Sequence, residues 1–193
     1  EEARAGQLGG GRRDEAVIAT KFGVRIDSTG RTFYDNGREW IEAALDGSLA
    51  RLGVDFIDLY QVHYLDGKTP LEDVIEVLER KADEGKIRFF GLSNVAARDL
   101  AGMKLPPRLV SFQNQYSLAN RTNERDIKTI CDETGIGFLS WGSLGQGVLT
   151  GKYNTDLQLR EDDRRLRPVY SNFHGHNLAR NRALVRAVLG RFG

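Results

Sequence analysis

The stretch SLARLGVDFIDLYQVHYLD, residues 48–66, sets the pattern that the rest of this chain repeats. It begins as the last turns of an amphipathic helix, turns at Gly53, and continues as an apolar strand over residues 56–62. The strand brings His63 to its carboxyl end. Because a histidine titrates near neutral pH and can donate or accept a proton, His63 is a candidate acid or electrophile. Taken alone, it fits a histidine that only caps a strand better than a catalytic one.

The same order of helix, turn, strand and polar residue recurs along the chain. Apolar spacing of three and four residues predicts a helix over residues 38–52. Pro70 followed by acidic residues is typical of a first helical turn and predicts a second helix over residues 70–86. The other predicted elements are strands at residues 16–21, 87–92, 109–112 and 136–140, short helices at 96–103 and 123–134, and a polar loop at 23–36.

Strands that are almost continuously apolar and alternate with helices indicate a parallel sheet covered on its faces. The two candidates are an open doubly wound sheet and a (β/α)8 barrel, in which the site gathers at the carboxyl ends of the strands. If the sheet closes, the side chains at the strand ends converge on one mouth. Phe89, Phe90 and Phe112 lie in strands and are expected in the core. The polar or aromatic residues that end the strands are Lys21, His63, Ser93 with Asn94, Gln113 and Trp141.

Composition excludes several classes of function. The 193 residues carry 28 Lys plus Arg against 27 Asp plus Glu, a formal net charge of +1, so no bulk charge favours nucleic acid or a membrane surface. The single cysteine, Cys131, excludes an intrachain disulfide and is typical of a reducing compartment. No apolar run is long enough for a membrane span, and the first residues lack the apolar core of a signal peptide. We expect one soluble, cytoplasmic domain over residues 1–193 that acts on a small molecule.

A glycine-rich segment at residues 141–153, WGSLGQGVLTGKY, follows the last predicted strand. It matches neither the dinucleotide fingerprint G-x-G-x-x-G nor the phosphate loop G-x-x-x-x-G-K-[ST]. Small residues that expose backbone N–H groups, with Lys152 close by, would still suit a pyrophosphate, and an ordinary flexible loop is an equal alternative. Acids interrupt the basic run at residues 160–167, which indicates a solvated loop. Two histidines within residues 173–176 lack partners at metal-ligand spacing, so no metal site is predicted.

Several stretches together resemble the aldo-keto reductase family. Residues 19–21 (ATK) resemble its lysine strand, and residues 48–63 resemble its long helix-and-strand signature that ends in the catalytic histidine. GKIRFFGLSN at residues 85–94 resembles the Gly-Lys-x-Arg-x-x-Gly-x-Ser-Asn strand, and FQNQYS at residues 112–117 the glutamine strand. Residues 141–153 resemble the loop that crosses the cofactor. The match runs through residues 12–189 in the family's order, and the long second motif is hard to obtain by chance.

The resemblance implies a (β/α)8 TIM barrel of which this chain holds strands three to seven, so that the barrel is incomplete at both ends. It implies an NADP(H)-dependent oxidoreductase that reduces a small-molecule aldehyde or ketone to an alcohol by hydride transfer. By similarity, Lys21 would perturb the proton donor, and His63 would orient the carbonyl or relay the proton. The implied cofactor-binding residues are Ser93, Asn94, Gln113 and Trp141 at the nicotinamide, and Gly142, Ser143, Leu144, Gly145, Gln146 and Lys152 at the pyrophosphate.

The sequence also departs from the family's pattern. The family's donor tyrosine lies in an Asp-x-Ala-x-x-Tyr-Gly segment that is absent here, and Tyr34 does not map onto it. Five strands do not close an eight-stranded barrel, so two open edges would be pairing surfaces and a homo-oligomer is possible. Without its donor, the chain alone is expected to be inactive. Two alternatives stay open: a non-catalytic NADP(H)-binding regulatory subunit of the same fold, against which His63 argues, and a truncated product without activity.

Overall fold

The computed structural model describes residue 2 and residues 13–153, 159–167 and 170–192. The chain divides into two compact units. The first unit comprises Glu1–Asn114 and Asp126–Leu139, and the second comprises Gln115–Arg125 and Ser140–Gly193. The expectation of a single domain stays a prediction.

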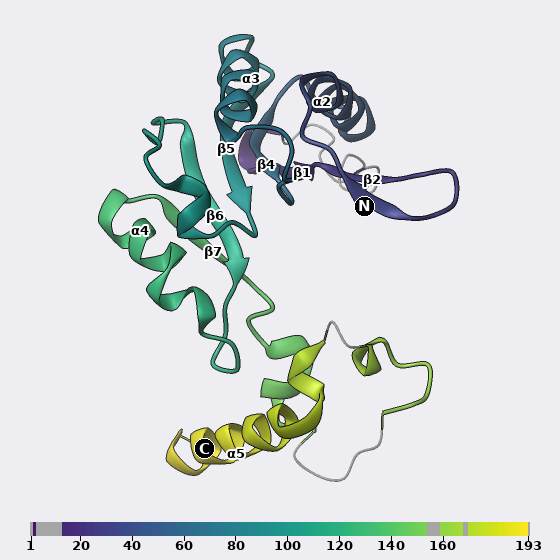
Figure 1. The fold of residues 1–193 in the computed structure, drawn as a ribbon, viewed down its shortest axis with the longest axis vertical. Helices are drawn as coiled ribbons and strands as arrows, with labels where there is room; N and C mark the ends of the chain where they lie inside the picture. The colour runs from purple at the N-terminus through teal and green to yellow at the C-terminus, as the bar shows by residue number, and fades with distance from the viewer. Residues whose placement is uncertain (1, 3–12, 154–158, 168–169, 193) are drawn as a thin grey trace. The chain divides into compact units, whose positions relative to one another are not determined.

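A five-stranded sheet in the order β1-β4-β5-β6-β7 forms the centre of the fold (Figure 1). The pairs β1–β4, β4–β5 and β5–β6 are parallel, as the alternation of apolar strands and helices predicted. Among the described residues, β1 and β7 each have one neighbour, so both lie at sheet edges. The strands are β1 (Ala19–Phe22), β4 (Ile57–Val62), β5 (Ile87–Ser93), β6 (Leu109–Gln115) and β7 (Gly137–Trp141).

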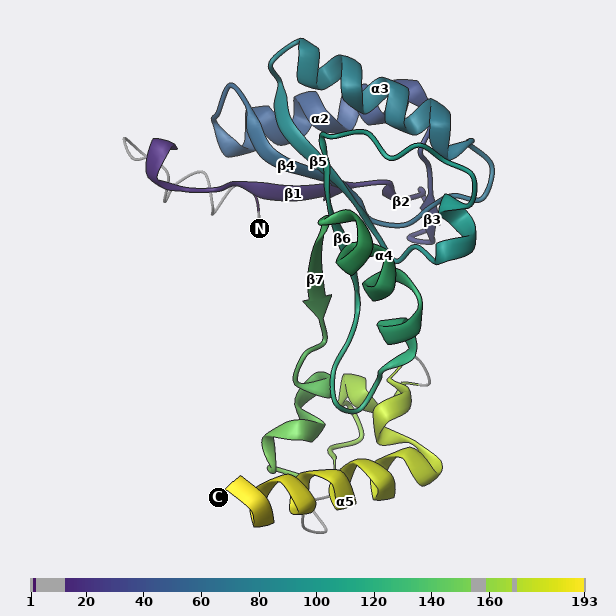
Figure 2. The same cartoon turned by 90° about the vertical axis from the view of Figure 1, so that its left-hand side faces the viewer.

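Two helices, α2 (Arg38–Leu52) and α3 (Leu71–Asp83), lie side by side over the same face of β1, β4 and β5 (Figure 2). The bounds of α2 are those predicted from its apolar spacing. It ends because Gly53 adopts φ +65°, a conformation that glycine enters without steric cost, and donates its N–H to the carbonyl of Leu49. Pro70 precedes the first turn of α3, where its missing N–H leaves no hydrogen bond unmade.

The helix predicted over residues 70–86 is slightly shorter than expected, because α3 ends at Asp83, and two other predicted helices differ more. Residues 123–134 form a 3-10 turn, η3 (Thr122–Arg125), and a helix, α4 (Ile127–Thr134). The break lies at Asp126, whose backbone is not helical and whose carboxylate accepts a hydrogen bond from the Ala97 N–H at 2.7 Å. The helix predicted at residues 96–103 is a single 3-10 turn, η2 (Ala97–Leu100). A contact between segments distant in sequence therefore interrupts local helix formation.

The prediction of a loop over residues 23–36 is wrong in part, because these residues contain a β-hairpin. Its antiparallel strands are β2 (Val24–Ile26) and β3 (Thr32–Tyr34). The turn closes when the Gly30 N–H donates to the carbonyl of Asp27 at 3.0 Å. The Asp27 carboxylate accepts hydrogen bonds from the N–H groups of Thr29 and Arg31. A short aspartate- and glycine-directed turn thus produced strands that apolar patterning did not reveal.

The main hydrophobic core lies between the sheet and its covering helices. Phe90 and Phe112 are fully buried, as expected, and they pack in this core with residues of α2 and α3. The same expectation is wrong for Phe89, which is 44% exposed. Successive side chains of a strand point to opposite faces, so Phe89 lies on the sheet face opposite to that of Phe90.

The second unit is built from short turns and one long helix. Its described 3-10 turns are η3, η4 (Gly145–Thr150), η5 (Arg164–Leu166) and η6 (Ser171–Phe173). Its helix is α5 (Gly175–Phe192), which the sequence patterns did not predict. A small core of Ala119, Val148, Tyr153 and Phe173 holds the unit together. Within the part of the chain that the structure describes, no helix is long and apolar enough to cross a bilayer, and no cluster of side chains has a metal-binding arrangement.

Asp58 connects the amino ends of three strands of the sheet. Its carboxylate accepts the Ile18 N–H at 2.8 Å and forms ion pairs with Arg13 at 2.7 Å and Arg88 at 2.9 Å. Both guanidinium groups also lie over the ring of Phe56. Burial raises the pKa of Asp58, but the hydrogen bonds from Ile18 and Arg13 outweigh burial and hold its pKa below the ordinary value of 3.8.

Replacement of this carboxylate should destabilise the chain. We expect Asp58→Ala to lower the free energy of unfolding by about 3 kcal/mol, because it leaves two cations and a backbone N–H without their acceptor. The stabilising effect of Asp58 is complete above pH 3.8 and is lost as the pH falls through its lower folded-state pKa. The measurement is urea unfolding followed by circular dichroism at several pH values.

The matched control is Asp46→Ala, since Asp46 also pairs with a cation, Lys86, but its side chain is 62% exposed. This variant should lose less than about 1 kcal/mol. Equal losses of unfolding free energy in the two variants would show that the buried Asp58 contacts stabilise the fold no more than the exposed Asp46 pair.

Candidate functional site

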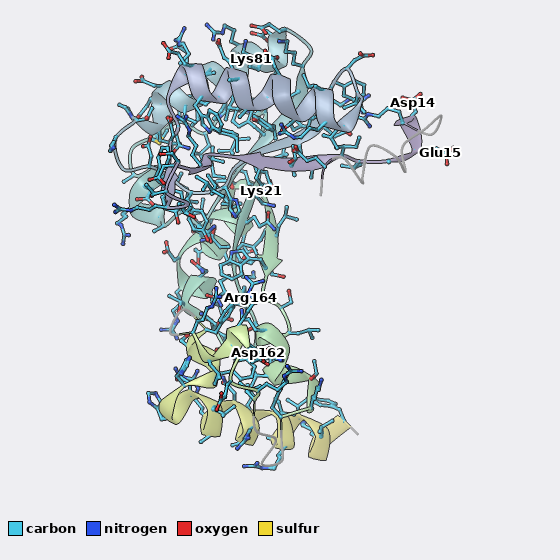
Figure 3. All side chains as sticks on the ribbon, turned by 90° about the vertical axis from the view of Figure 1, so that its right-hand side faces the viewer. Asp14, Glu15, Lys21, Lys81, Asp162 and Arg164 are labelled. Atoms are coloured by element: carbon cyan, nitrogen blue, oxygen red, sulfur yellow. The ribbon has the colours of Figure 1, made fainter. Side chains whose placement is uncertain are left out.

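Four strands of the first unit bring the predicted catalytic residues and three of the four predicted nicotinamide residues to one end of the sheet. Lys21 lies at the end of β1 (Figure 3), opposite Gln61 of β4. His63 follows β4 directly, and its N–H donates to the carbonyl of Phe22 at 2.9 Å. This parallel register places Lys21 and His63 on adjacent strand ends, as the sequence predicted.

Hydrogen bonds connect the next two strand ends to His63. The Asn94 side-chain amide donates to the carbonyl of His63 at 2.9 Å and to the hydroxyl of Ser93 at 3.2 Å. The Ser93 hydroxyl donates to the carbonyl of Gln113 at 2.7 Å, and the Asn94 N–H donates to the same oxygen at 3.0 Å. The structure therefore brings four of the predicted residues, from β4, β5 and β6, into one bonded group.

The side chain of Gln113 has a feature that points to a ligand. Its Oε1 atom is buried and has no hydrogen-bond partner among the described residues. A buried amide oxygen without a donor costs free energy, and such atoms in proteins usually have a partner. A bound group with an amide N–H would supply that donor beside Ser93 and Asn94.

The electrostatics of His63 favour a neutral imidazole at pH 7. Partial burial lowers its pKa below the ordinary value of 6.5, and the nearby positive charge of Lys21 lowers it further. A neutral imidazole has one N–H donor and one acceptor nitrogen. It can therefore donate a hydrogen bond to a carbonyl oxygen without carrying a charge of its own.

Two tyrosines that the sequence did not assign to the site lie beside His63. The ring of Tyr64 stacks on the imidazole with 4.9 Å between ring centroids. Tyr34, from the β2–β3 hairpin, stacks on Tyr64 at the same separation. Tyr64 could have been suspected because it follows His63 in the chain, but Tyr34 is 29 residues upstream and no local pattern placed it here.

The predicted pyrophosphate residues belong to the second unit, as does Trp141. Trp141 is half-buried, and its carbonyl accepts the Tyr116 N–H at 3.2 Å. The segment that follows is a series of tight turns, in which the Gly145 N–H donates to the carbonyl of Gly142 at 2.7 Å. Five residues of this segment have positive φ: Gly142, Gly145, Gln146, Gly147 and Gly151. Successive turns of this kind present backbone N–H groups to an anion.

Positive φ favours glycine at two of these positions, and at Gly145 a close neighbour also excludes a side chain. A Cβ atom at Gly145 would lie 2.9 Å from the Val148 side chain, and one at Gly147 would lie 3.4 Å from the ring of Tyr153. Gln146, at φ +55°, is held by Asn172, whose amide donates to its Oε1 at 2.7 Å. Ser143, Leu144 and Lys152 are exposed.

Residues 160–167 form a largely exposed segment of turns, as the sequence predicted. Five of them, Arg160, Asp162, Asp163, Arg164 and Arg165, line an open pocket of about 550 Å³ in the second unit with Gln146 and Tyr170. Figure 3 labels Asp162 and Arg164. Arg160 and Arg165 pair with Asp162 and Asp163, respectively. Arg164 is exposed and forms no ion pair with any residue that the structure describes. Gln146, a predicted pyrophosphate residue, lines the same pocket as these arginines. The mixed charges of residues 160–167 did not indicate this arrangement.

Comparison with known proteins connects these observations to a family. The model of the family described as "Aldo/keto reductase family" matches residues 1–187. The chain is 37% identical over 183 residues to "Aldo-keto reductase yakc [NADP(+)]" of Schizosaccharomyces pombe, covering 92% of this chain and 53% of that protein. It is 34% identical over 155 residues to "Aldo-keto reductase YhdN" of Bacillus subtilis, covering 80% of this chain and 46% of that protein. The chain thus spans about half the length of these curated relatives.

Solved structures give the same result. The glycerol dehydrogenase AKR11B4 from Gluconobacter oxydans superposes with a TM-score of 0.85 at 30% identity, covering 96% of this chain and 57% of that one. An aldo/keto reductase from Klebsiella pneumoniae in complex with NADP and acetate superposes with a TM-score of 0.64 at 25% identity, covering 89% and 55%. These matches confirm the predicted fold class, part of a (β/α)8 barrel.

The backbone of Asn94 gives a direct test of how the site is held. Asn94 adopts φ +58°, which is costly for a residue with a Cβ atom. We expect Asn94→Ala to be less stable than Asn94→Gly by about 1 kcal/mol, because both lose the side-chain hydrogen bonds but only alanine is strained. Urea unfolding of the two variants measures the difference. Equal stabilities would mean that the residue does not need this conformation.

Proposed function

The chain belongs to the aldo/keto reductase family, and on this premise we propose that its function is NADP(H)-dependent reduction of an aldehyde or ketone to an alcohol by hydride transfer. The observation that carries the proposal is the bonded group His63, Asn94, Ser93 and Gln113 beside Lys21, in which the buried Oε1 of Gln113 has no hydrogen-bond partner among the described residues. A relative named for NADP(+) and a solved relative in complex with NADP support the cofactor.

The residues present fit this cofactor. Gln113 Oε1 would accept a hydrogen bond from the nicotinamide carboxamide, next to the polar groups of Ser93 and Asn94. The Trp141 ring would stack on the nicotinamide, and its flat face would fix which side of that ring meets the substrate. The turns at residues 142–146, with Lys152, would hold the pyrophosphate through backbone N–H groups and one cation. When bound, the reduced cofactor supplies the hydride.

The catalytic side chains would act on the substrate's oxygen. As hydride reaches the carbonyl carbon, negative charge develops on that oxygen, and a donor aimed at it lowers the barrier. His63, kept neutral by burial and by Lys21, would donate that hydrogen bond and orient the carbonyl. The Lys21 ammonium would favour the ionised form of a neighbouring proton donor and so lower the donor's pKa.

The 193 residues alone are proposed to lack this activity. The family's donor tyrosine has no counterpart in the sequence, and a proton donor must lie within hydrogen-bond reach of the substrate oxygen. Within the described residues, β1 and β7 are edge strands, so no closed barrel surrounds the site. A non-catalytic NADP(H)-binding regulatory subunit is the second candidate, and the juxtaposition of His63 with Lys21 favours the enzyme over it.

Cofactor binding should depend on Trp141. We expect Trp141→Ala to weaken NADPH binding about fivefold, because stacking contributes about 1 kcal/mol beyond buried area. NMR titration of the chain with NADPH measures affinities down to the millimolar range. The control is Trp40→Phe, since Trp40 belongs to α2 and not to the proposed site. Unchanged affinity in Trp141→Ala would refute the assignment.

Carbonyl reduction tests the catalytic residues. The chain alone should not oxidise NADPH with a small aldehyde, whereas a chimera that adds the flanking segments of the Gluconobacter enzyme should do so. In that chimera, Lys21→Met and His63→Ala should lower kcat by about 10²-fold or more with little change in NADPH affinity. The exposed lysine variant Lys104→Met should have no effect.

Turnover by the unmodified chain would contradict the proposed inactivity and would mean that another residue donates the proton. Equal losses of rate and NADPH affinity in the Lys21 and His63 variants would mean that both residues are structural.

A further inference from the structure

The β2–β3 hairpin has a contact that its turn and strands do not require. Tyr34, its last strand residue, turns its ring onto Tyr64, with ring centroids 4.9 Å apart and planes inclined by 27°. Tyr64 in turn stacks on the His63 imidazole, with centroids 4.9 Å apart and planes inclined by 20°. Three rings from two distant segments therefore form one continuous stack that ends at the proposed catalytic histidine.

A second set of contacts fixes the hairpin relative to His63. Two residues after Tyr34, the Asn36 N–H donates to the Asp66 carboxylate at 2.9 Å, and the Asp66 N–H donates to Asn36 Oδ1 at 2.8 Å. Asn36 is 1% exposed, so these reciprocal hydrogen bonds are shielded from water. The same carboxylate accepts the N–H groups of Lys68 and Thr69. The position of the Tyr34 ring is thus held by a buried connection and not by the stack alone.

The surroundings of the imidazole show what the stack contributes. Lys21 approaches His63 from β1, and the Asn94 amide binds the His63 carbonyl from β5, but neither contact sets the plane of the ring. Tyr64 covers the imidazole, and Tyr34 lies against Tyr64. Burial is the largest cause of the lowered pKa of His63. Part of the cover over the imidazole therefore comes from Tyr64, and Tyr34 packs behind Tyr64.

We propose that Tyr34 and Tyr64 are positioning residues, which hold the His63 imidazole in one orientation and shield it from water. The role rests on the proposed function, because an imidazole needs a fixed direction only if it must meet a substrate oxygen. In this role, the β2–β3 hairpin contributes to the candidate site through Tyr34. Neither tyrosine hydroxyl is required for this role, since the stack depends on the faces of the rings.

The stack can be tested without any activity. Nuclear Overhauser effects in the unmodified chain should connect the ring protons of Tyr34 with Tyr64 and those of Tyr64 with His63. In an NMR pH titration, Tyr34→Ala and Tyr64→Ala should raise the pKa of His63 toward 6.5, because the ring loses cover. Tyr34→Phe and Tyr64→Phe should titrate like the unmodified chain.

Two results would overturn the proposal: missing ring-to-ring Overhauser effects in the unmodified chain, or the same His63 titration in the alanine and phenylalanine variants. The Overhauser measurement needs no substitution, so it decides the question even where a variant fails to fold.

The active chimera separates this proposal from the proposed function. In the chimera, Tyr34→Ala should lower kcat roughly threefold to tenfold and shift the pH profile of kcat. It should leave the KM for NADPH unchanged. Tyr34→Phe should show no loss of kcat. A normal rate in His63→Ala would refute the catalytic role proposed for His63. The Overhauser and titration results would still show whether the three rings stack. A normal rate in Tyr34→Ala beside a slow His63→Ala would reject the positioning role alone.

Discussion

The register of the parallel strands is the constraint on which the candidate site depends, and the buried Asp58 carboxylate fixes it. Asp58 accepts hydrogen bonds from the segment before β1 and from Arg88 of β5, while it belongs to β4 itself. A slip of one residue would turn the apolar side chains of a strand to the opposite face. Because the amino ends of these strands are held in register, their carboxyl ends bring Lys21, His63 and Asn94 to one level. A charge network at one end of the sheet thus supports the candidate site at the other.

The site itself is held mostly by backbone atoms. The carbonyls of His63 and Gln113 accept hydrogen bonds from Asn94 and Ser93, so these bonds do not occupy the His63 imidazole or the Gln113 side-chain amide. Close packing of β5 on β6 contributes as well, since a Cβ atom at Gly91 would lie 2.9 Å from the carbonyl of Ser111. Residues that look like a binding set are therefore of two kinds, those that would contact a ligand and those that keep the strand ends together.

In the second unit, a series of tight turns is held in place without a sheet. Positive φ at Gly145 and Gly147 permits the turns, and the edge-on contact of Tyr153 with Phe173 packs beneath them. The Asn172 amide holds the strained Gln146 by its side chain. The acids of residues 160–167 pair with two of its arginines, which keeps a concentrated positive charge from repelling itself.

Local patterns in the sequence were sufficient for the alternation of strands and helices, the bounds of α2, and the polar residues at the strand ends, because apolar spacing and glycine stops act over a few residues. The family motifs added the roles of those residues. Only the tertiary structure decided the break at Asp126, the exposure of Phe89, the pocket beside Gln146 and the stack of Tyr34 on Tyr64. Each of these depends on a partner distant in sequence or on the face that a strand presents. Contacts of that kind exist only once the chain has folded, so no short-range pattern records them.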